Sequence, residues 1–462
     1  MLYFSLSFKP LVLYFLILIG QYGPIFTIWI GSKPLVVLCG YEMIKEALID
    51  HAEEFGGRNI LPTIERIFHN QSWYCLATDD ERNWKERRHF MLSTLRNFGM
   101  GKKQMSERVQ EEALCLVEEV GSIQGQPFEP KRKCTNAVSN IICAVVFGNR
   151  FDYQNQTFIE NQKTLESLLK YHYRYFCEIQ FLPSRPWHLC DFPRIMEYLP
   201  GQHTKTFADI EKLCDFIHEK VVLHQKTLDI QEPRDFIDCF LIKSEKEQNS
   251  SNIIYTPESL VRFVLEMFFA GTVSTSNVLV SSLLVVAKLP HIQAKVQQEI
   301  TEVVGTNRIP SMEDRLKMPF TNAVIHEVQR CWKDSLETFP RATTCDLKFH
   351  GYNIPKYTAV VPVLPSVHFD PLQWETPGKF NPDHFLDEKG QFRKRDAFMA
   401  FSAGKRSCPG EALARMEVFL FFSALLQKFT FYLDVDTKDM DVISLITDFK
   451  NNKAPLLRNG YN

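Results

Sequence analysis

The apolar residues of this chain begin as one dense block and then settle into regular spacing. Leu11 to Ile19 reads LVLYFLILI, between Lys9-Pro10 and Gly20-Gln21. This run alone is shorter than the ~20 residues that span a bilayer, but counting from Leu2 gives enough length. We therefore predict that residues 1–21 form an apolar segment that attaches the chain to a membrane. A signal peptide is the alternative, although no small-residue cleavage site is evident.

Downstream, short apolar runs predict strands and longer periodic runs predict helices. Ile25 to Ile30 and Leu35 to Leu38 are typical of a hairpin, and Gly351 to Val361 is typical of the strands of a small sheet. Helical patterns are found over Tyr41–His51, Asp79–Leu95, Asn136–Phe147 and Glu411–Gln427, around Val109, Ala113, Leu116 and Val120, and in several helices between Phe158 and Lys243 that are separated by proline loops. The pattern predicts a mainly α fold with small β-sheets, of the α+β class.

The longest helical pattern starts at Thr256, a suitable N-cap followed by Pro257, and ends at Pro290. Such a helix would be about 50 Å long and would cross the molecule. Midway lies the segment Ala270-Gly271-Thr272-Val273-Ser274-Thr275, in which a helical Gly costs about 1 kcal/mol relative to Ala. Two interpretations stay open: close helix packing through small side chains, or a kink over a bound ligand.

Composition narrows the class of protein. The 462 residues contain no linker rich in Pro, Gly or Ser and no long charge run, so we expect residues 22–462 to form a single domain. A net charge of −2 gives no reason to expect nucleic acid as a partner. The 12 cysteines lack paired spacing, which argues for a reducing compartment and against a disulfide framework.

One short loop carries the strongest chemical signal. Phe401 to Gly410 reads FSAGKRSCPG and presents Cys408 between two glycines, just after the basic Lys405 and Arg406. Glycines let a backbone turn tightly and approach a flat ligand, while cationic neighbours and loop amides favour a thiolate. A cysteine taken alone is usually a small buried hydrophobic residue. The full pattern F-x-x-G-x-R-x-C-x-G, however, resembles the haem-binding loop of the cytochrome P-450 superfamily.

Two residue pairs lie on predicted helices. Trp84 and Arg88 are four residues apart and share one helix face, although a packed Trp beside a solvated Arg is the more common explanation. Glu327 and Arg330 have the i, i+3 spacing of a surface ion pair worth a few tenths of a kcal/mol. The apolar residues around Glu327 indicate burial instead, which favours a structural ion pair.

From Tyr22 to the C-terminus the chain is similar to the microsomal second family of cytochromes P-450, nearest to the J-like subfamily that oxidises polyunsaturated fatty acids and drugs. The stretches LRNFGMGKKQ, NAVSNIIC, FNPDHFL and the haem loop carry this resemblance. It implies a helix-rich triangular fold, haem b ligated by Cys408, and electrons from NADPH through a flavoprotein reductase, with cytochrome b5 as a further partner. It also implies an endoplasmic reticulum membrane protein whose catalytic domain faces the cytosol and takes an apolar small-molecule substrate.

The resemblance also assigns roles to particular residues. The haem is expected to contact Trp84, Arg88, Arg341, Arg406, Phe401 and Gly410. Catalytic residues on the central helix are expected to be Gly271, Ser274 and Thr275, and the substrate side is expected to be lined by Phe269, Ala270 and Phe339. Glu327 and Arg330 are expected to lock onto Pro382–Phe385, where His384 stands in place of a common Arg. Apart from the resemblance, the clustered cations near the cysteine loop predict that the reductase docks on Arg393, Lys394 and Arg395, and also on Lys102 and Lys103, with a solvated basic turn as the alternative.

The sequence departs from the family pattern in three places. Val273 and Ser274 stand where A-G-x-[DE]-T has an acid and a threonine. The usually apolar segment before Pro340 contains the polar residues Asp334, Ser335 and Glu337, and the apolar N-terminus runs into Tyr22 without a proline-rich hinge and first helix.

Three function classes therefore stay open. A monooxygenase is the favoured hypothesis. A haem-thiolate isomerase or dehydratase acting on a lipid hydroperoxide would not need the missing acid, because its substrate brings its own O–O bond. The third class is a haem-binding protein with little turnover.

Overall fold

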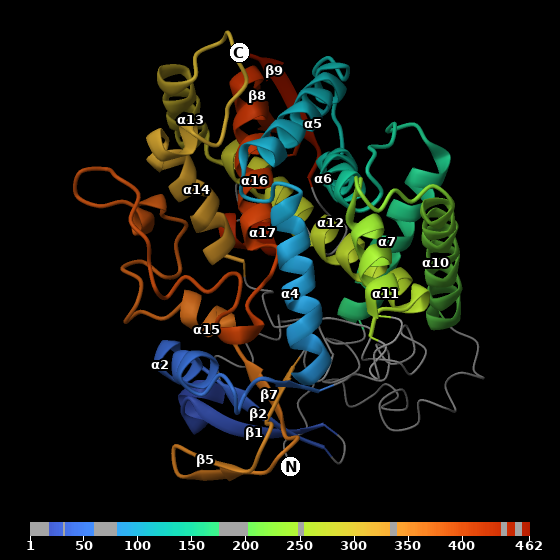
Figure 1. Cartoon of the computed structure of the whole chain (residues 1–462). Helices are drawn as coiled ribbons and strands as arrows, with labels where there is room; N and C mark the ends of the chain where they lie inside the picture. Colours follow the sequence, from blue (N-terminus) through green and yellow to red (C-terminus); the bar gives the residue numbers. More distant parts are fainter. Residues whose placement is uncertain are drawn as a thin grey trace.

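The protein is described from a computed structural model, which covers residues 18–30, 33–59, 81–174, 202–247, 254–332, 340–435, 441–448 and 455–462. Most of these residues lie in helices, and the largest sheet lies to one side of the helical body (Figure 1). The expectation of a mainly α fold with small β-sheets is confirmed.

The α-helices cover most of the chain. They are α2 (Tyr41–Lys45), α4 (Glu81–Asn97), α5 (Lys103–Gly121), α6 (Pro130–Val146), α7 (Gln156–Arg174), α10 (Gln202–Lys226), α11 (Phe236–Glu247), α12 (Pro257–Lys288), α13 (Pro290–Val303), α14 (Pro319–Arg330), α15 (Leu364–His368), α16 (Glu411–Lys428) and α17 (Val442–Asp448). Single turns of π- or 3₁₀-helix are η1 (Glu46–Asp50), η4 (Asp314–Lys317), η5 (Pro382–Phe385) and η6 (Gly404–Arg406).

The strands form one larger sheet and two hairpins. They are β1 (Ile25–Ile30), β2 (Lys33–Leu38), β3 (Gly57–Arg58), β4 (Arg341–Ala342), β5 (Leu347–Phe349), β6 (Tyr352–Ile354), β7 (Ala359–Pro362), β8 (Phe429–Leu433) and β9 (Leu457–Tyr461). The larger sheet has the order β1-β2-β7-β4-β3, in which β2 and β7 run parallel and the other pairs are antiparallel. Antiparallel pairs β5-β6 and β8-β9 form the other two sheets.

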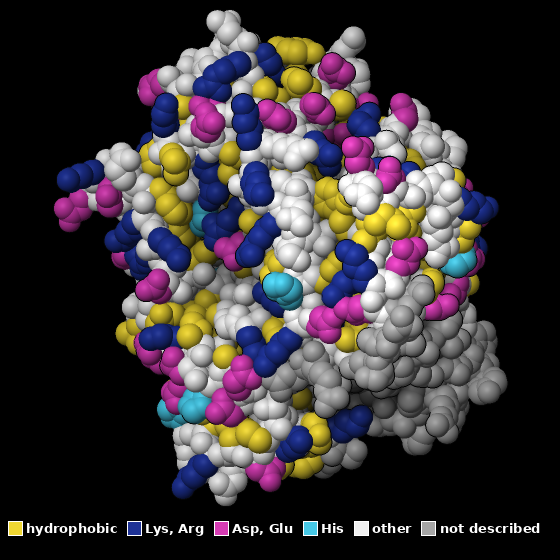
Figure 2. All heavy atoms as spheres, in the orientation of Figure 1, with side chains coloured by type: hydrophobic (Ala, Val, Ile, Leu, Met, Phe, Trp, Pro, Cys, Tyr) yellow, Lys and Arg dark blue, Asp and Glu magenta, His cyan; other side chains and the backbone are white. Residues whose placement is uncertain are grey.

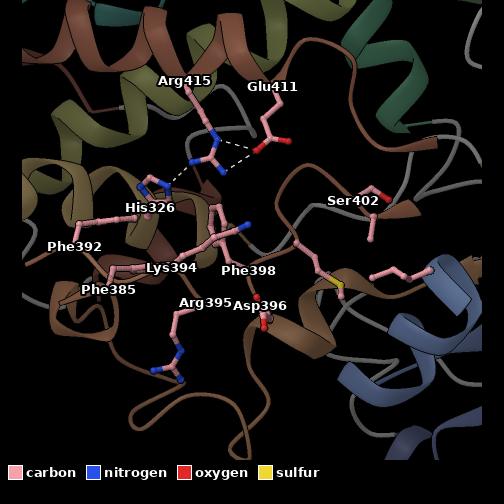
Figure 3. Close-up of a pocket in the computed structure, with 13 residues that line it drawn as sticks. His326, Phe385, Phe392, Lys394, Arg395, Asp396, Phe398, Ser402, Glu411 and Arg415 are labelled. Atoms are coloured by element: carbon pink, nitrogen blue, oxygen red, sulfur yellow. Dashed lines mark hydrogen bonds and ion pairs between the residues drawn. The ribbon is translucent and has the colours of Figure 1, made fainter. Parts of the chain in front are cut away.

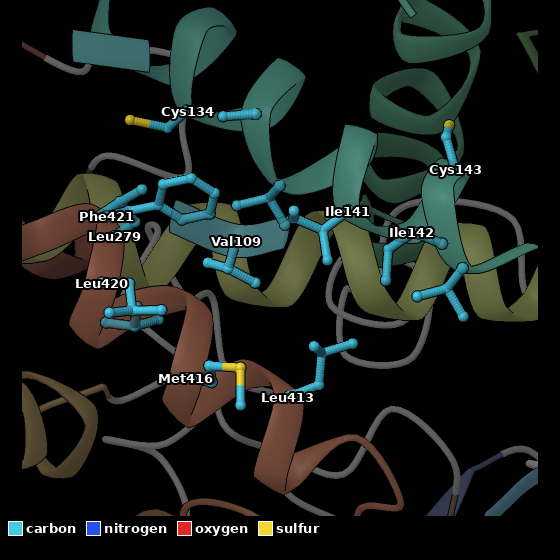
Figure 4. Packing of buried hydrophobic residues seen from close by; sticks show 14 of the residues in the cluster. Val109, Cys134, Ile141, Ile142, Cys143, Leu279, Leu413, Met416, Leu420 and Phe421 are labelled. Carbon is cyan, nitrogen blue, oxygen red and sulfur yellow. The ribbon is translucent and has the colours of Figure 1, made fainter. Parts of the chain in front are cut away.

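Helix α12 is the centre of the core. It starts with a capping box in which Thr256 and Ser259 each bond the other's backbone N–H, which fixes the first turn. Its apolar side chains then pack against α6 and α16, as in the cluster around Leu279, Ile141 and Leu420 (Figure 4). Because α16 starts directly after the cysteine loop, this core holds the loop in place.

Most predicted elements are confirmed, with two differences. The predicted helix Tyr41–His51 is α-helical only to Lys45 and continues as a π-turn, η1. Gly351 to Val361 does not belong to one small sheet, because β6 pairs with β5 whereas β7 joins the larger sheet. Hydrophobic periodicity could not predict which strands pair, since strand pairing depends on residues that are far apart in the sequence.

Several predictions lie outside the described residues. These are residues 1–17 of the predicted anchor at residues 1–21, the proline loops near Pro183, Pro186, Pro193 and Pro200, and the segment 333–339 with Phe339 and the polar residues Asp334, Ser335 and Glu337. Within the described ranges, α12 alone is long and apolar enough to cross a membrane, and 67% of its apolar window is buried in the protein. We therefore interpret α12 as a core helix. The nine described cysteines are all free.

Candidate functional site

Cys408 lies between η6 and α16 on a loop that the backbone shapes closely. Its N–H donates to the Phe401 carbonyl at 2.9 Å, and the Ser407 N–H donates to the Gly404 carbonyl at 3.1 Å. Gly404 has φ of +70°, and a Cβ atom there would lie 1.7 Å from the Leu48 carbonyl oxygen. Only glycine allows the loop to approach η1 this closely.

Gly410 differs from the expectation that both glycines permit a tight turn. Its φ is −87°, which any residue adopts, and a Cβ atom there would find its nearest neighbour, the Cys408 Sγ, at 3.8 Å. A side chain at this position would therefore make an ordinary contact. The tight turn depends on Gly404 and not on Gly410.

The surroundings of the Cys408 sulfur also differ from the expectation that the loop favours a thiolate. Although the Cys408 side chain is solvent-exposed, the protein packed around its sulfur raises the pKa of the thiol. The backbone N–H groups of Gly410 and Glu411 and the positive charge of Arg88 act in the opposite, predicted direction but do not prevail. Lys405 pairs with Glu53 at 2.8 Å and does not help. The prediction that the loop alone favours the thiolate is therefore wrong, whereas a metal ion bound at the sulfur would lower the pKa of the thiol.

Three guanidinium groups gather beside this loop. Arg88 donates to the Ser407 hydroxyl at 3.4 Å, Arg341 donates to the Ser402 hydroxyl at 3.1 Å, and Arg406 donates to the Gly56 carbonyl at 3.0 Å. Arg341 and Arg406 are buried. Burial lowers the pKa of Arg88, the Cys408 sulfur opposes this, and the positive charge of Arg341 lowers it further.

Trp84 joins this group through cation–π contacts. The indole is buried, and the guanidinium carbons of Arg406 and Arg88 lie 3.9 Å and 5.7 Å from its ring centroid. The predicted shared face of Trp84 and Arg88 is therefore confirmed, and Arg88 is not a freely solvated cation.

These residues fit a haem group. An exposed cysteine sulfur suits iron, and the guanidinium groups of Arg88, Arg341 and Arg406 beside the same loop suit carboxylates such as the two haem propionates. The guanidinium carbon of Arg415 lies 5.1 Å from the ring centroid of Phe401. The predicted haem contact of Phe401 stays a prediction.

The central segment of α12 presents two kinds of surface. Ala270 and Ser274, one turn apart, are exposed, and the Ser274 hydroxyl donates to the Ala270 carbonyl at 2.7 Å. Gly271 faces α6 instead, where a Cβ atom would lie 2.5 Å from Ile142 Cδ1, and Thr275 is buried. The helix stays α-helical throughout this segment. Close packing therefore explains Gly271, and of the predicted catalytic residues only Ser274 lies on the exposed face.

Glu327 and Arg330 form a fully buried ion pair, with Arg330 Nε and Nη2 each 2.7 Å from the carboxylate oxygens. Arg330 also donates to the carbonyls of His368, Pro377 and Lys379. The structural interpretation of this pair is confirmed, since every donor has a protein acceptor.

His384 takes the place of the common arginine in this network. Its Nδ1 lies 3.2 Å from both oxygens of Glu327, while its Nε2 accepts from the Thr376 N–H at 3.1 Å. A neutral imidazole with the proton on Nδ1 satisfies both contacts. The segment Pro382–Phe385 is thus held by Glu327 as predicted.

Sequence reasoning missed two serines of the site. Ser402 and Ser407 accept from Arg341 and Arg88, and Ser402 has a left-handed φ of 59°. Both occupy variable positions of the loop pattern, so the pattern itself gives no signal for them.

A cysteine loop with three guanidinium groups beside it is the arrangement expected of a haem-thiolate protein. The cytochrome P450 family model matches residues 5–453, and the chain belongs to this family. It is 46% identical to cytochrome P450 2C14 of Oryctolagus cuniculus over 92% of this chain and 84% of that protein. It is 47% identical to cytochrome P450 2C20 of Macaca fascicularis over 92% and 84%, and 44% identical to cytochrome P450 2G1 of Rattus norvegicus over 95% and 86%.

The protein is therefore a haem-thiolate monooxygenase of the second P450 family, with haem b as cofactor and NADPH-derived electrons reaching it through a reductase. The resemblance to the J-like subfamily stays a prediction.

Proposed function

We propose that this protein inserts one oxygen atom from O2 into an apolar substrate, such as a polyunsaturated fatty acid or a xenobiotic, with a flavoprotein reductase as the electron donor. We also propose an endoplasmic reticulum membrane location with the catalytic domain facing the cytosol. The observation that carries the proposal is the exposed Cys408 sulfur beside Arg88, Arg341 and Arg406.

In this proposal each residue has a limited role. Cys408 holds the iron, while Arg88, Arg341, Arg406 and the Trp84 indole orient the propionates. When bound, the haem supplies the redox chemistry, and its thiolate ligand favours O–O bond cleavage. The exposed face of α12 supports a substrate role for Ala270, with the half-buried Phe269 beside it. Ser274 would offer its hydroxyl oxygen as a hydrogen-bond acceptor on this face, because its O–H donates to the Ala270 carbonyl.

The role of Cys408 is tested by its replacement. Cys408→Ser is expected to abolish the red-shifted Soret band of the ferrous carbonyl complex, because an alkoxide or water cannot replace sulfur opposite the gas. Cys345→Ser, which replaces the other exposed cysteine of the described residues, is the matched control. A normal shifted band in the serine variant would remove the assignment.

A peroxide isomerase or dehydratase is the second candidate, and Val273 favours it. Valine cannot relay a proton, and the nearby Ser274 hydroxyl already donates to a helix carbonyl. A lipid library should be incubated with reductase and NADPH, and separately with lipid hydroperoxides without reductant. Substrate-dependent NADPH consumption with oxygenated product supports the monooxygenase. Hydroperoxide conversion alone would support the second candidate, and no turnover in either arm would support a poorly active haem-binding protein.

We further propose that the reductase, with cytochrome b5 as a second partner, docks on the basic face near the cysteine loop. Lysine and arginine side chains gather on the face that carries α4 (Figure 2). Arg393 and Arg395 share the carboxylate of Glu375 at 3.0 Å each, and Lys103 lies 3.8 Å from Glu107. Lys102 and Lys394 are exposed and have no ion pair with another described residue.

The docking proposal predicts which charges steer the partner. Neutralising Lys102 and Lys394 together should lower the association rate with reductase more than neutralising Arg393 and Arg395, whose charge Glu375 partly cancels. Stopped-flow rates at several salt concentrations measure this. Equal rates for both double variants would contradict it.

A further inference from the structure

A pocket of about 440 Å³ lies beside the cysteine loop, on the side of α14 and α16 (Figure 3). Its walls come from the segment 392–403, from η5 and from the first turns of α16. Of the residues placed at the haem site, Ser402 also lines this pocket, whereas no residue of the substrate face of α12 does. Its volume is in the range of small-molecule sites, which are mostly apolar with a few placed polar groups.

One wall of the pocket is aromatic. Phe385 and Phe392 are parallel within 4° with ring centroids 6.2 Å apart, and Phe398 meets Phe385 edge-on at 5.3 Å. The His326 ring lies 4.7 to 5.4 Å from these three rings. Burial and the charge of Arg415 lower the pKa of His326 to about 3, so it is a neutral part of the wall. Such a wall favours a flat aromatic ligand through offset and edge contacts.

The cations of the pocket differ in what they already bind. Arg415 bonds Glu411 at 2.9 Å and His326 Nε2 at 2.5 Å, and Arg395 is paired with Glu375. Lys394 is exposed, lines the pocket, and has no ion pair among the described residues. Asp396 is also exposed at the rim. A ligand anion would therefore bind at the Lys394 ammonium and away from Asp396.

We propose that this pocket binds a small aromatic carboxylate, with its ring against Phe385, Phe392 and Phe398 and its carboxylate at Lys394. Ser402 and Ala403 of the cysteine loop form another part of the lining. Ser402 accepts a hydrogen bond from Arg341, which belongs to the haem site. A ligand in the pocket would therefore contact a residue that itself contacts the haem site.

The site does not depend on the docking proposal. Where reductase docks on Lys394 as proposed, an occupied pocket covers that contact, and the ligand inhibits electron transfer by competition. Binding can be measured without reductase, so failure of the two ideas can be told apart.

The test uses para-benzoylbenzoate on the ferric holoprotein, since its benzophenone group is photoreactive and forms a covalent bond to a nearby C–H group on irradiation. Mapping by mass spectrometry should place the label on residues 385–403, with Met399 as a pocket-lining acceptor. Lys394→Gln should weaken labelling about tenfold, which is the effect of one charge-assisted contact, and Lys394→Arg should retain it. Lys102→Gln is the matched control for an exposed lysine elsewhere on this face, and it should label normally.

The neutral para-benzoylbenzamide separates charge recognition from apolar binding. It should label residues 385–403 about tenfold less than the carboxylate does. Equal labelling by the amide, no effect of Lys394→Gln, or label confined to α12 and hence to the substrate side would each overturn the proposal.

Discussion

Ser274 has a single hydroxyl proton, and the structure places it on the Ala270 carbonyl at 2.7 Å. The hydroxyl can then accept a hydrogen bond from the active-site side but has no second proton to give. Val273 beside it has none. A positioned acid and hydroxyl typically contribute ~10²–10⁴-fold to proton transfer, so this chain lacks a large part of that effect.

We therefore predict poor coupling between NADPH consumption and product formation. Most electrons should leave as hydrogen peroxide, and Val273→Glu with Ser274→Thr should raise product formed per NADPH several-fold. The threonine methyl restricts the rotamer, and the glutamate supplies the proton. Val273→Gln with Ser274→Thr is the matched control, because glutamine has the same size but no acidic proton. Tight coupling in the natural protein would count against this prediction.

The two glycines of the cysteine loop give a second prediction at this scale. Gly404→Ala should abolish stable haem binding, because a left-handed alanine costs about 1–2 kcal/mol and its Cβ would overlap the Leu48 carbonyl. Gly410→Ala should keep the thiolate-type Soret band and change the thermal midpoint little. The ferrous carbonyl spectrum and a thermal melt measure both. Equal loss in the two variants would show that the loop geometry is misassigned.

Among the elements, the join between α10 and α11 is held by a buried ionic contact. His224 Nδ1 donates to the Lys220 carbonyl at 2.7 Å, and Nε2 lies 2.7 Å from Asp235 Oδ2. Both partners are acceptors, so the imidazole must carry both protons. Asp238 is close but is held by Arg234, which leaves this cluster an ion-pair network and not a metal site.

This contact predicts a pH-dependent stability. Burial lowers the pKa of His224, but the hydrogen bonds to Asp235 and Lys220 outweigh it and raise the pKa above its usual value. The stabilisation is therefore full below the unfolded pKa of about 6.5 and is lost as pH rises through the folded pKa. At pH 6, His224→Gln should lower the free energy of unfolding by about 1–3 kcal/mol, and the difference should shrink at high pH. Urea unfolding measures it, with the exposed His218→Gln as control.

The elements also show where sequence reasoning succeeds. The span of α12 was predictable because Thr256-Pro257 and Pro290 mark its ends. The cysteine loop was predictable because its pattern is dense. Which face Gly271 or Thr275 takes was not, since that depends on the packing of α6, which lies far away in sequence. The ion pair of Lys405 was not predictable for the same reason, because its partner Glu53 is far away in the sequence.

For the molecule as a whole, two buried neutral histidines determine part of the response to acid. His326 donates from Nδ1 to the Asn322 carbonyl, and His368 Nε2 accepts from the Met399 N–H. Burial, with the charge of Arg415 in one case and of Arg330 in the other, lowers both pKa values to about 3. Both imidazoles stay neutral in the folded protein until the pH approaches 3, because burial and the neighbouring guanidinium oppose a second positive charge.

Acid should therefore begin to destabilise the fold at pH values well above those at which carboxylates titrate. The unfolded chain takes up protons at these histidines below pH about 6.5, so stability falls as pH drops from there toward 3, by up to about 2 kcal/mol for each at pH 5. Urea unfolding at pH 7 and pH 5 measures the loss. His368→Gln should flatten it, while the exposed His291→Gln should not. An unchanged slope in His368→Gln would mean that other groups dominate.

Helix α12 combines two demands in one element. Ala270 and Ser274 are exposed and form a narrow strip, while every position from Leu279 to Ala287 is buried in the core. Substitutions on the strip change no packing, so chemistry and substrate choice can drift there by single replacements without loss of the fold. Substitutions on the buried faces open cavities that cost about 2–5 kcal/mol each for large-to-Ala changes. In laboratory evolution, accepted changes in α12 should therefore concentrate on that strip, and the helix would supply new specificities while its other faces stay fixed.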